Sequence, residues 1–148
     1  MNGDSRALGL VPHLFVEDID EALSFYRTAF GATELFRSAL ADGTVLFVEL
    51  AVGEARLLVS EEVPQLSALG PSTIGGTPVL LTLETADPDD LARRAVFAGA
   101  TVEAPVEEMF FGERYGRVVD PAGHRWALTT KRERFTPEDI EARTPREI

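Results

Sequence analysis

Short apolar or alternating segments, separated by turn residues, predict eight β-strands in this chain. Alternation with a period of two indicates a strand that buries one face, as in Leu46, Val48 and Leu50, whose side chains share one side. Turn pairs such as Asp42-Gly43 separate neighbouring strands. The predicted strands are residues 10–16, 33–39, 44–51, 55–60, 79–85, 101–106, 115–119 and 125–130.

Two amphipathic helices are predicted between these strands. Asp18, followed three residues later by Glu21, is typical of a capping box, and Gly31 is suited to the helix end. Asp87 and Pro88 begin the second helix, which ends at Ala98-Gly99. A third, short helix is predicted after Thr136-Pro137, near the end of the chain.

The two long helices belong to an internal repeat. Each is capped by aspartate and followed by the tripeptide Gly-Ala-Thr, at residues 31–33 and 99–101. Each copy reads strand, helix, strand, strand, strand, and such a unit cannot cover both faces of its sheet. We therefore predict an α+β fold in which two βαβββ modules form an open, cupped mixed β-barrel with helices outside. The predicted segments are a tail (1–8), a first module (9–60), a linker loop (61–78), a second module (79–130) and a C-terminal tail with a short helix (131–148).

Composition narrows the function classes. The chain has 148 residues, 45% of them apolar, and a net charge of −11, which argues against binding to nucleic acid or to an anionic membrane surface. The absence of cysteine excludes disulfides and thiolate metal sites. No segment is typical of a signal peptide, and no apolar run approaches the ~20 residues of a membrane helix, so we expect a cytoplasmic protein.

The best-known nucleotide and hydrolase motifs are absent from the sequence. It contains no P-loop, no GxGxxG and no GxSxG, and its serines have no neighbouring histidine in sequence. A short basic cluster, formed by Lys131, Arg132 and Arg134, is interpreted as a solvated edge because the whole chain is acidic.

Strand parity predicts which side chains face the barrel cavity. His13 is a candidate general acid or base, and its structural alternative is a core histidine with a hydrogen-bonded neighbour. Glu49 is the second candidate for proton transfer, and its alternative is an ion pair with Arg117 or Arg56. His124 is expected to point away from the cavity and not to converge with His13, and Trp126 is expected to face the helix layer.

Further residues on the same face are candidates for ligand binding. Aromatic faces, small apolar patches and a few ionisable groups suit planar organic ligands with polar edges. Phe110 and Phe111, which precede Gly112, are interpreted equally as a lid over the pocket or as a dimer contact. The predicted ligand-binding residues are Phe15, Phe47, Arg56, Thr82, Phe110, Phe111, Tyr115 and Arg117.

Three segments carry a family resemblance over residues 9–130. They are VEDIDEALSFYRTAFGAT, the second Gly-Ala-Thr after a helix, and RYGRVVDPAGHRW. The chain resembles the vicinal oxygen chelate superfamily, which includes glyoxalase I, ring-cleaving dioxygenases and bleomycin- and fosfomycin-resistance proteins. The last segment resembles its demethylubiquinone-methyltransferase-like branch, associated with phosphonate operons.

The resemblance also bears on metal binding and assembly. Metal enzymes of the superfamily place ligands at positions that correspond here to Val11, Leu58, Leu80 and Ala127, none of which can bind a metal. We therefore predict no metal and no cofactor. The superfamily usually dimerises, which implies a homodimer.

Three functional hypotheses follow. The first is metal-independent binding of a small aromatic or polycyclic molecule in the cavity, with antibiotic sequestration as one form of it. The second is a metal-free isomerase, epimerase or cyclase that uses His13 and Glu49 for proton transfer. The third is a metal-dependent lyase, transferase or dioxygenase with displaced ligands. The expected partners are a small molecule and a second copy of the chain, with no nucleic acid and no membrane.

Overall fold

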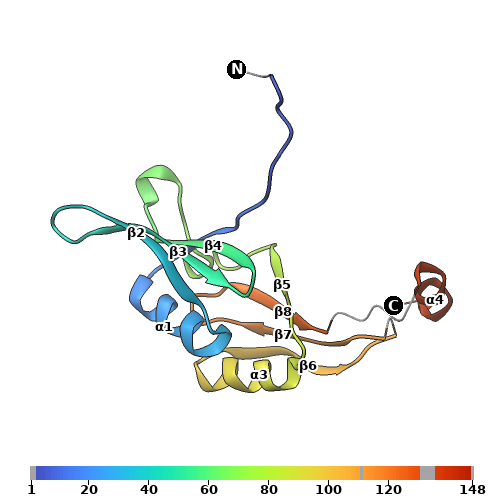
Figure 1. The fold of residues 1–148 in the computed structure, drawn as a ribbon. Helices are drawn as coiled ribbons and strands as arrows, with labels where there is room; N and C mark the ends of the chain where they lie inside the picture. Colours follow the sequence, from blue (N-terminus) through green and yellow to red (C-terminus); the bar gives the residue numbers. More distant parts are fainter. Residues whose placement is uncertain (1–2, 111, 131–135, 148) are drawn as a thin grey trace.

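The computed structural model describes residues 3–110, 112–130 and 136–147 of the chain. Figure 1 shows two small sheets with two long helices packed on one side of them. The strands are β1 (His13–Val16), β2 (Thr33–Ala39), β3 (Val45–Val52), β4 (Ala55–Glu61), β5 (Leu80–Glu84), β6 (Thr101–Glu108), β7 (Arg114–Val119) and β8 (Arg125–Thr129). The helices are α1 (Ile19–Phe30), α2 (Pro71–Ile74), α3 (Pro88–Phe97) and α4 (Pro137–Arg143), with a short 3-10 helix at Pro64–Leu66.

The two sheets repeat one topology. Their strand orders are β1-β4-β3-β2 and β5-β8-β7-β6, and in each the first and last strands of the repeat pair in parallel. The remaining neighbours pair antiparallel. The prediction of a mixed α+β fold built from a repeated βαβββ unit is confirmed, and the sheets remain open instead of closing into a barrel (Figure 1).

Side-chain caps set the limits of the two long helices. Asp18 accepts the backbone N–H of Glu21 at the start of α1, and Gly31 ends that helix with a φ of 67°. Asp87 accepts the N–H of Asp90 in the same way at the start of α3. The two helices contact each other, and their apolar faces complete one core with the sheet faces that they cover (Figure 1). No helix in the described ranges combines the length and apolar composition needed to cross a membrane.

Most predicted strand limits agree with the structure to within one residue, and three other differences are larger. The linker 61–78 contains the 3-10 turn and α2, because Pro64 and Pro71 each begin a helical turn in which a missing N–H costs nothing. β1 begins at His13, where its ladder with β4 starts, and residues 3–12 before it form neither helix nor strand (Figure 1). β6 continues to Glu108 because its ladder with β7 extends to Arg114.

A buried polar network joins the two repeats. Tyr26 of α1 donates its hydroxyl hydrogen to Asp120 Oδ2 at 2.5 Å, and Trp126 Nε1 of β8 donates to the same oxygen at 2.9 Å. The other oxygen of Asp120 accepts the backbone N–H groups of Ala122 and His124, at 2.9 and 3.0 Å. Trp126 packs on the ring of Tyr26, as predicted for a residue facing the helix layer.

The buried network should make the stability of the fold depend on pH in the alkaline range. Burial, and then the nearby Asp120 carboxylate, raise the pKa of Tyr26 well above its usual value. Because the unfolded chain loses this proton near pH 10, the contribution of Tyr26 to the free energy of unfolding should be constant below about pH 10 and should fall above it. Urea titrations between pH 8 and 11 measure the slope. The Tyr26→Phe variant should lose most of this slope, and an unchanged slope would contradict its assignment to the Tyr26 hydroxyl.

Candidate functional site

Two cavities lie at the seam where β1 and β4 approach β5. They have volumes of about 320 and 270 Å³, and they share Pro12 and Leu81 in their walls. The larger cavity reaches Trp126 and the segment Gly9–Pro12, while the smaller one reaches Leu69 and Val79. The seam therefore has mostly apolar walls contributed by both repeats, with polar groups at a few points.

The seam brings together four of the predicted site residues. His13 and Phe15 line the smaller cavity, and Arg56 and Thr82 line the larger one. Phe47, Glu49, Tyr115 and Phe110 line neither of these two cavities. Arg117 contributes to a third cavity, between α3 and β6. Phe111 and the basic cluster Lys131, Arg132 and Arg134 lie outside the described residues.

His13 has a defined environment at the mouth of the smaller cavity. Its Nε2 lies 2.8 Å from Oγ of the buried Ser60, and its ring stacks on Phe15 with centroids 4.6 Å apart. Partial burial lowers the pKa of His13, so the imidazole is neutral at pH 7 and keeps one donor and one acceptor nitrogen. Sequence reasoning missed Ser60 as its partner, although strand parity puts Ser60 on the same face as Leu58.

His124 departs from its prediction. Strand parity placed it away from the cavity, but it lines the cavity that His13 also lines. The physical reason is that β8 begins at Arg125, so the conformation of His124 is set by the turn and its bond to Asp120. Its Nε2 lies 2.8 Å from the carbonyl oxygen of Phe15 and must carry the proton, because a carbonyl only accepts.

Glu49 forms one of the two ion pairs considered from the sequence. Its carboxylate lies 2.6 Å from Nη1 of Arg56, across the antiparallel pair of β3 and β4. Arg117 instead shares Glu103 with Arg125, at 3.1 and 2.9 Å, and hydrogen bonds from Arg125 and Arg117 lower the pKa of Glu103. The carboxylate of Glu49 is therefore already paired on the open face of the first sheet.

Aromatic side chains occupy both open sheet faces. Phe47 contacts Phe36, with ring centroids 5.8 Å apart, and Phe36 is 54% exposed. Sequence reasoning did not name Phe36, which lies beside a register shift that changes strand parity in β2. Tyr115 lies on the second sheet, with the guanidinium carbon of Arg117 6.0 Å from its ring centroid.

Metal ligands do not cluster in the described parts of the chain. No group of three or more histidine, cysteine, aspartate or glutamate side chains there could hold a metal ion. His13 and His124 line the same cavity, but Nε2 of His13 contacts Oγ of Ser60, and Nε2 of His124 contacts the carbonyl oxygen of Phe15.

Comparisons with known proteins agree with this architecture. The sequence model of the Glyoxalase/Bleomycin resistance protein/Dioxygenase superfamily matches residues 9–128. The Mycobacterium tuberculosis protein Rv0887c is 37% identical over 147 residues, covering 95% of this chain and 86% of that protein. TioX from Micromonospora sp. ML1 has a crystal structure with a TM-score of 0.66 and 28% identity, covering 84% of this chain and 98% of TioX. The Arabidopsis thaliana protein At5g48480 has 30% identity and a TM-score of 0.66, covering 83% of this chain and 98% of that structure.

Proposed function

This chain belongs to the Glyoxalase/Bleomycin resistance protein/Dioxygenase superfamily, and we propose that it binds a small aromatic or polycyclic molecule in the seam without a metal ion. The observation that carries the proposal is the stacked pair of His13 and Phe15 at the smaller cavity. Stacked rings offer a flat apolar surface, and the neutral imidazole offers a hydrogen bond at its edge. The demethylubiquinone-methyltransferase-like branch stays a prediction.

The rest of the seam supports a planar organic ligand. Pro12 and Leu81 line both cavities, so a ligand longer than either one would contact these two side chains. Arg56 and Thr82 then give polar contacts at the far end. Cavities with apolar walls and few polar groups are typical small-molecule sites.

Metal independence rests on the side chains at the positions implied by the family resemblance. Leu58 pairs with His13 and Glu49 across the first sheet, and Ala127 pairs with Thr82 and Arg117 across the second. Neither offers a donor atom for a metal.

A metal-free enzyme is the second candidate, favoured by the contact of His13 with Ser60. A neutral histidine with a lowered pKa can accept a proton from a bound substrate. Glu49 is a weaker second group, because Arg56 already neutralises its carboxylate. Proton transfer in this reading depends on His13 alone, and binding remains the better-supported function.

We also propose a homodimer, and antibiotic sequestration as one form of the binding function. β2 is an edge strand with exposed apolar residues on both faces, Leu35 on one and Phe36 on the other. Such an edge invites pairing with another chain unless it is covered. Phe110 is also exposed, and it stays a candidate either for a lid over the pocket or for a dimer contact.

The experiment is native mass spectrometry on protein purified without added metal, with elemental analysis of the same sample. We expect a dimer that carries an organic mass and no stoichiometric metal. One zinc, nickel, manganese or iron ion per chain would overturn metal independence.

A Phe15→Ala variant tests the seam itself. Loss of the stacked ring should lower affinity for the co-purified molecule by about tenfold or more, since an aromatic contact contributes about 0.5–1.5 kcal/mol beyond its buried area. Titration of the released molecule into both proteins measures the change. The control is Leu66→Ala, which removes an exposed apolar side chain that lines none of the described cavities, and equal affinities for the two variants would contradict the seam site.

A further inference from the structure

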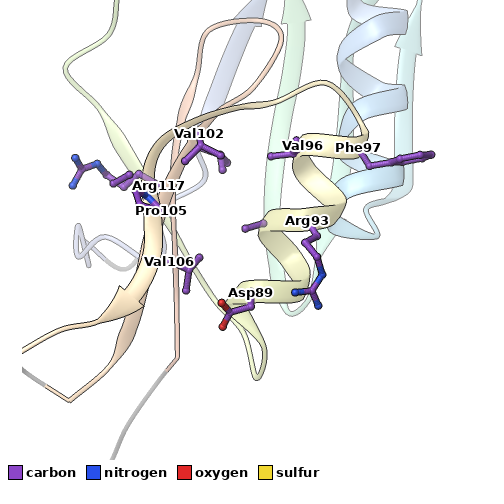
Figure 2. A pocket seen from close by; sticks show the side chains of 11 residues that line it. Asp89, Arg93, Val96, Phe97, Val102, Pro105, Val106 and Arg117 are labelled. Atoms are coloured by element: carbon purple, nitrogen blue, oxygen red, sulfur yellow. The ribbon is translucent and has the colours of Figure 1, made fainter.

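The largest of the described cavities lies away from the seam, on the helix side of the second sheet. It is a groove with a volume of about 480 Å³. Its walls come from α3 and β6 (Figure 2). Val96 of the helix and Val102 of the strand point toward each other across it, and Pro105 and Val106 also line the strand side (Figure 2). Phe97 borders the groove at the end of α3, with its ring directed away from the strand (Figure 2). The groove shares no residue with the two seam cavities.

Backbone irregularity in β6 creates this groove. The register with β7 shifts on both sides of Ala104, next to Pro105, which has no N–H to donate to a ladder. Small side chains widen the gap, because Ala92 of α3 and Ala104 of β6 both line it. The floor is well packed, since Val118 is fully buried.

The rim of the groove is apolar and open to solvent. Val96 is 46% exposed, Val102 is 48% exposed and Phe97 is 87% exposed. Within the described ranges, these three side chains form no part of the hydrophobic core. An apolar hollow flanked by exposed apolar side chains on a strongly acidic chain is typical of a binding site.

Charged side chains at one end of the groove determine which class of ligand it favours. Asp89 is held by two hydrogen bonds from Arg114, at 2.8 and 2.9 Å. Arg93, one turn further along α3, has a longer contact of 3.4 Å to Asp90, and its side chain is 70% exposed. An exposed ion pair of this kind adds little stability, so a carboxylate can replace Asp90 on the guanidinium. Arginine binds carboxylates through two parallel hydrogen bonds, which fixes the orientation of the ligand.

We propose that this groove binds amphipathic carboxylates. The apolar part of the ligand lies against Val96, Val102 and Val106, and its carboxylate pairs with Arg93 at the helix surface. Phe97, in the last turn of α3, borders the apolar end without covering it. This site is separate from the seam, and it does not depend on the function proposed there.

Isothermal titration with decanoate tests the site, and decanol provides the uncharged probe of equal chain length. We expect wild-type protein to bind both, with decanoate at least tenfold tighter, because a charge-assisted pair adds to the same apolar contact. Arg93→Gln should remove that difference without weakening decanol. Arg27→Gln, which removes an exposed arginine from α1, is the matched control and should leave both affinities unchanged.

Two further variants separate this groove from other surfaces. Ala104→Phe fills the groove and should abolish binding of both probes. Val102→Asp, at the exposed rim, should weaken decanoate at least tenfold in a folded protein if Ala104→Phe does not fold. Decanoate binding that survives both Arg93→Gln and Val102→Asp would overturn the proposal. A change from dimer to monomer in Val102→Asp on size-exclusion chromatography would also overturn it, since a second copy would then cover the groove.

Discussion

Replacing Asp120 with alanine is expected to lower the free energy of unfolding by about 3–5 kcal/mol. The substitution leaves the Tyr26 hydroxyl and the Trp126 indole N–H buried without their acceptor. Each buried donor without a partner costs about 1–3 kcal/mol, and two backbone N–H groups of the turn also lose their acceptor. Since small domains have about 5–15 kcal/mol of stability, this single change removes a large part of it. Equilibrium urea unfolding measures the loss.

Two comparison variants separate the buried network from a general effect of removing aspartate. Asp18→Ala removes an exposed helix cap and should cost about 1 kcal/mol. Asp120→Asn should cost more than Asp18→Ala, because one carboxylate oxygen becomes an NH₂ group that faces existing donors in either orientation. Equal losses for Asp18→Ala and Asp120→Ala would contradict the role of the network.

Gly116→Val is expected to cost about 3 kcal/mol through overpacking between β7 and β6. A Cβ atom at Gly116 would lie 2.7 Å from the Val106 side chain and 3.0 Å from its backbone. The neighbour cannot turn aside, because part of the contact is main chain. Thermal unfolding should show a lower midpoint, and decanoate binding should weaken as Val106 moves.

The matched control places the same valine where there is space. At Gly9 an added Cβ meets nothing within 4 Å, so Gly9→Val should change stability by less than about 0.5 kcal/mol. If Gly116→Val and Gly9→Val have the same thermal-unfolding midpoint, β6 must be able to shift at Pro105 without loss of stability.

Local chemistry made most of the fold predictable from the sequence. Asp18, Gly31 and Asp87 act within one turn of their own positions, so their capping roles could be predicted without tertiary structure. Parity also placed Trp126 on the helix side. The helical turns at Pro64 and Pro71 were missed, because proline and glycine in the same segment are equally typical of a loop.

The site was less predictable because its contacts join distant segments. The bond between His13 and Ser60 crosses from β1 to β4, and no local pattern marks it. His124 was misplaced because strand parity was extended into a turn. Strand parity predicts the face on which a residue lies but not its neighbours on other strands. It therefore left both Arg56 and Arg117 as possible ion-pair partners of Glu49.

The contacts between repeats have a consequence for the order of folding. Tyr26 and Asp120 are separated by 94 positions, and His124 and Phe15 by 109. Contacts between such distant residues form slowly, whereas the hairpins β2–β3 and β7–β8 close short loops. Each repeat should therefore form its hairpins early, and docking of α1 against the β7–β8 turn should come late. Loss of Asp120 would then act mainly on the rate of unfolding, leaving the rate of folding almost unchanged.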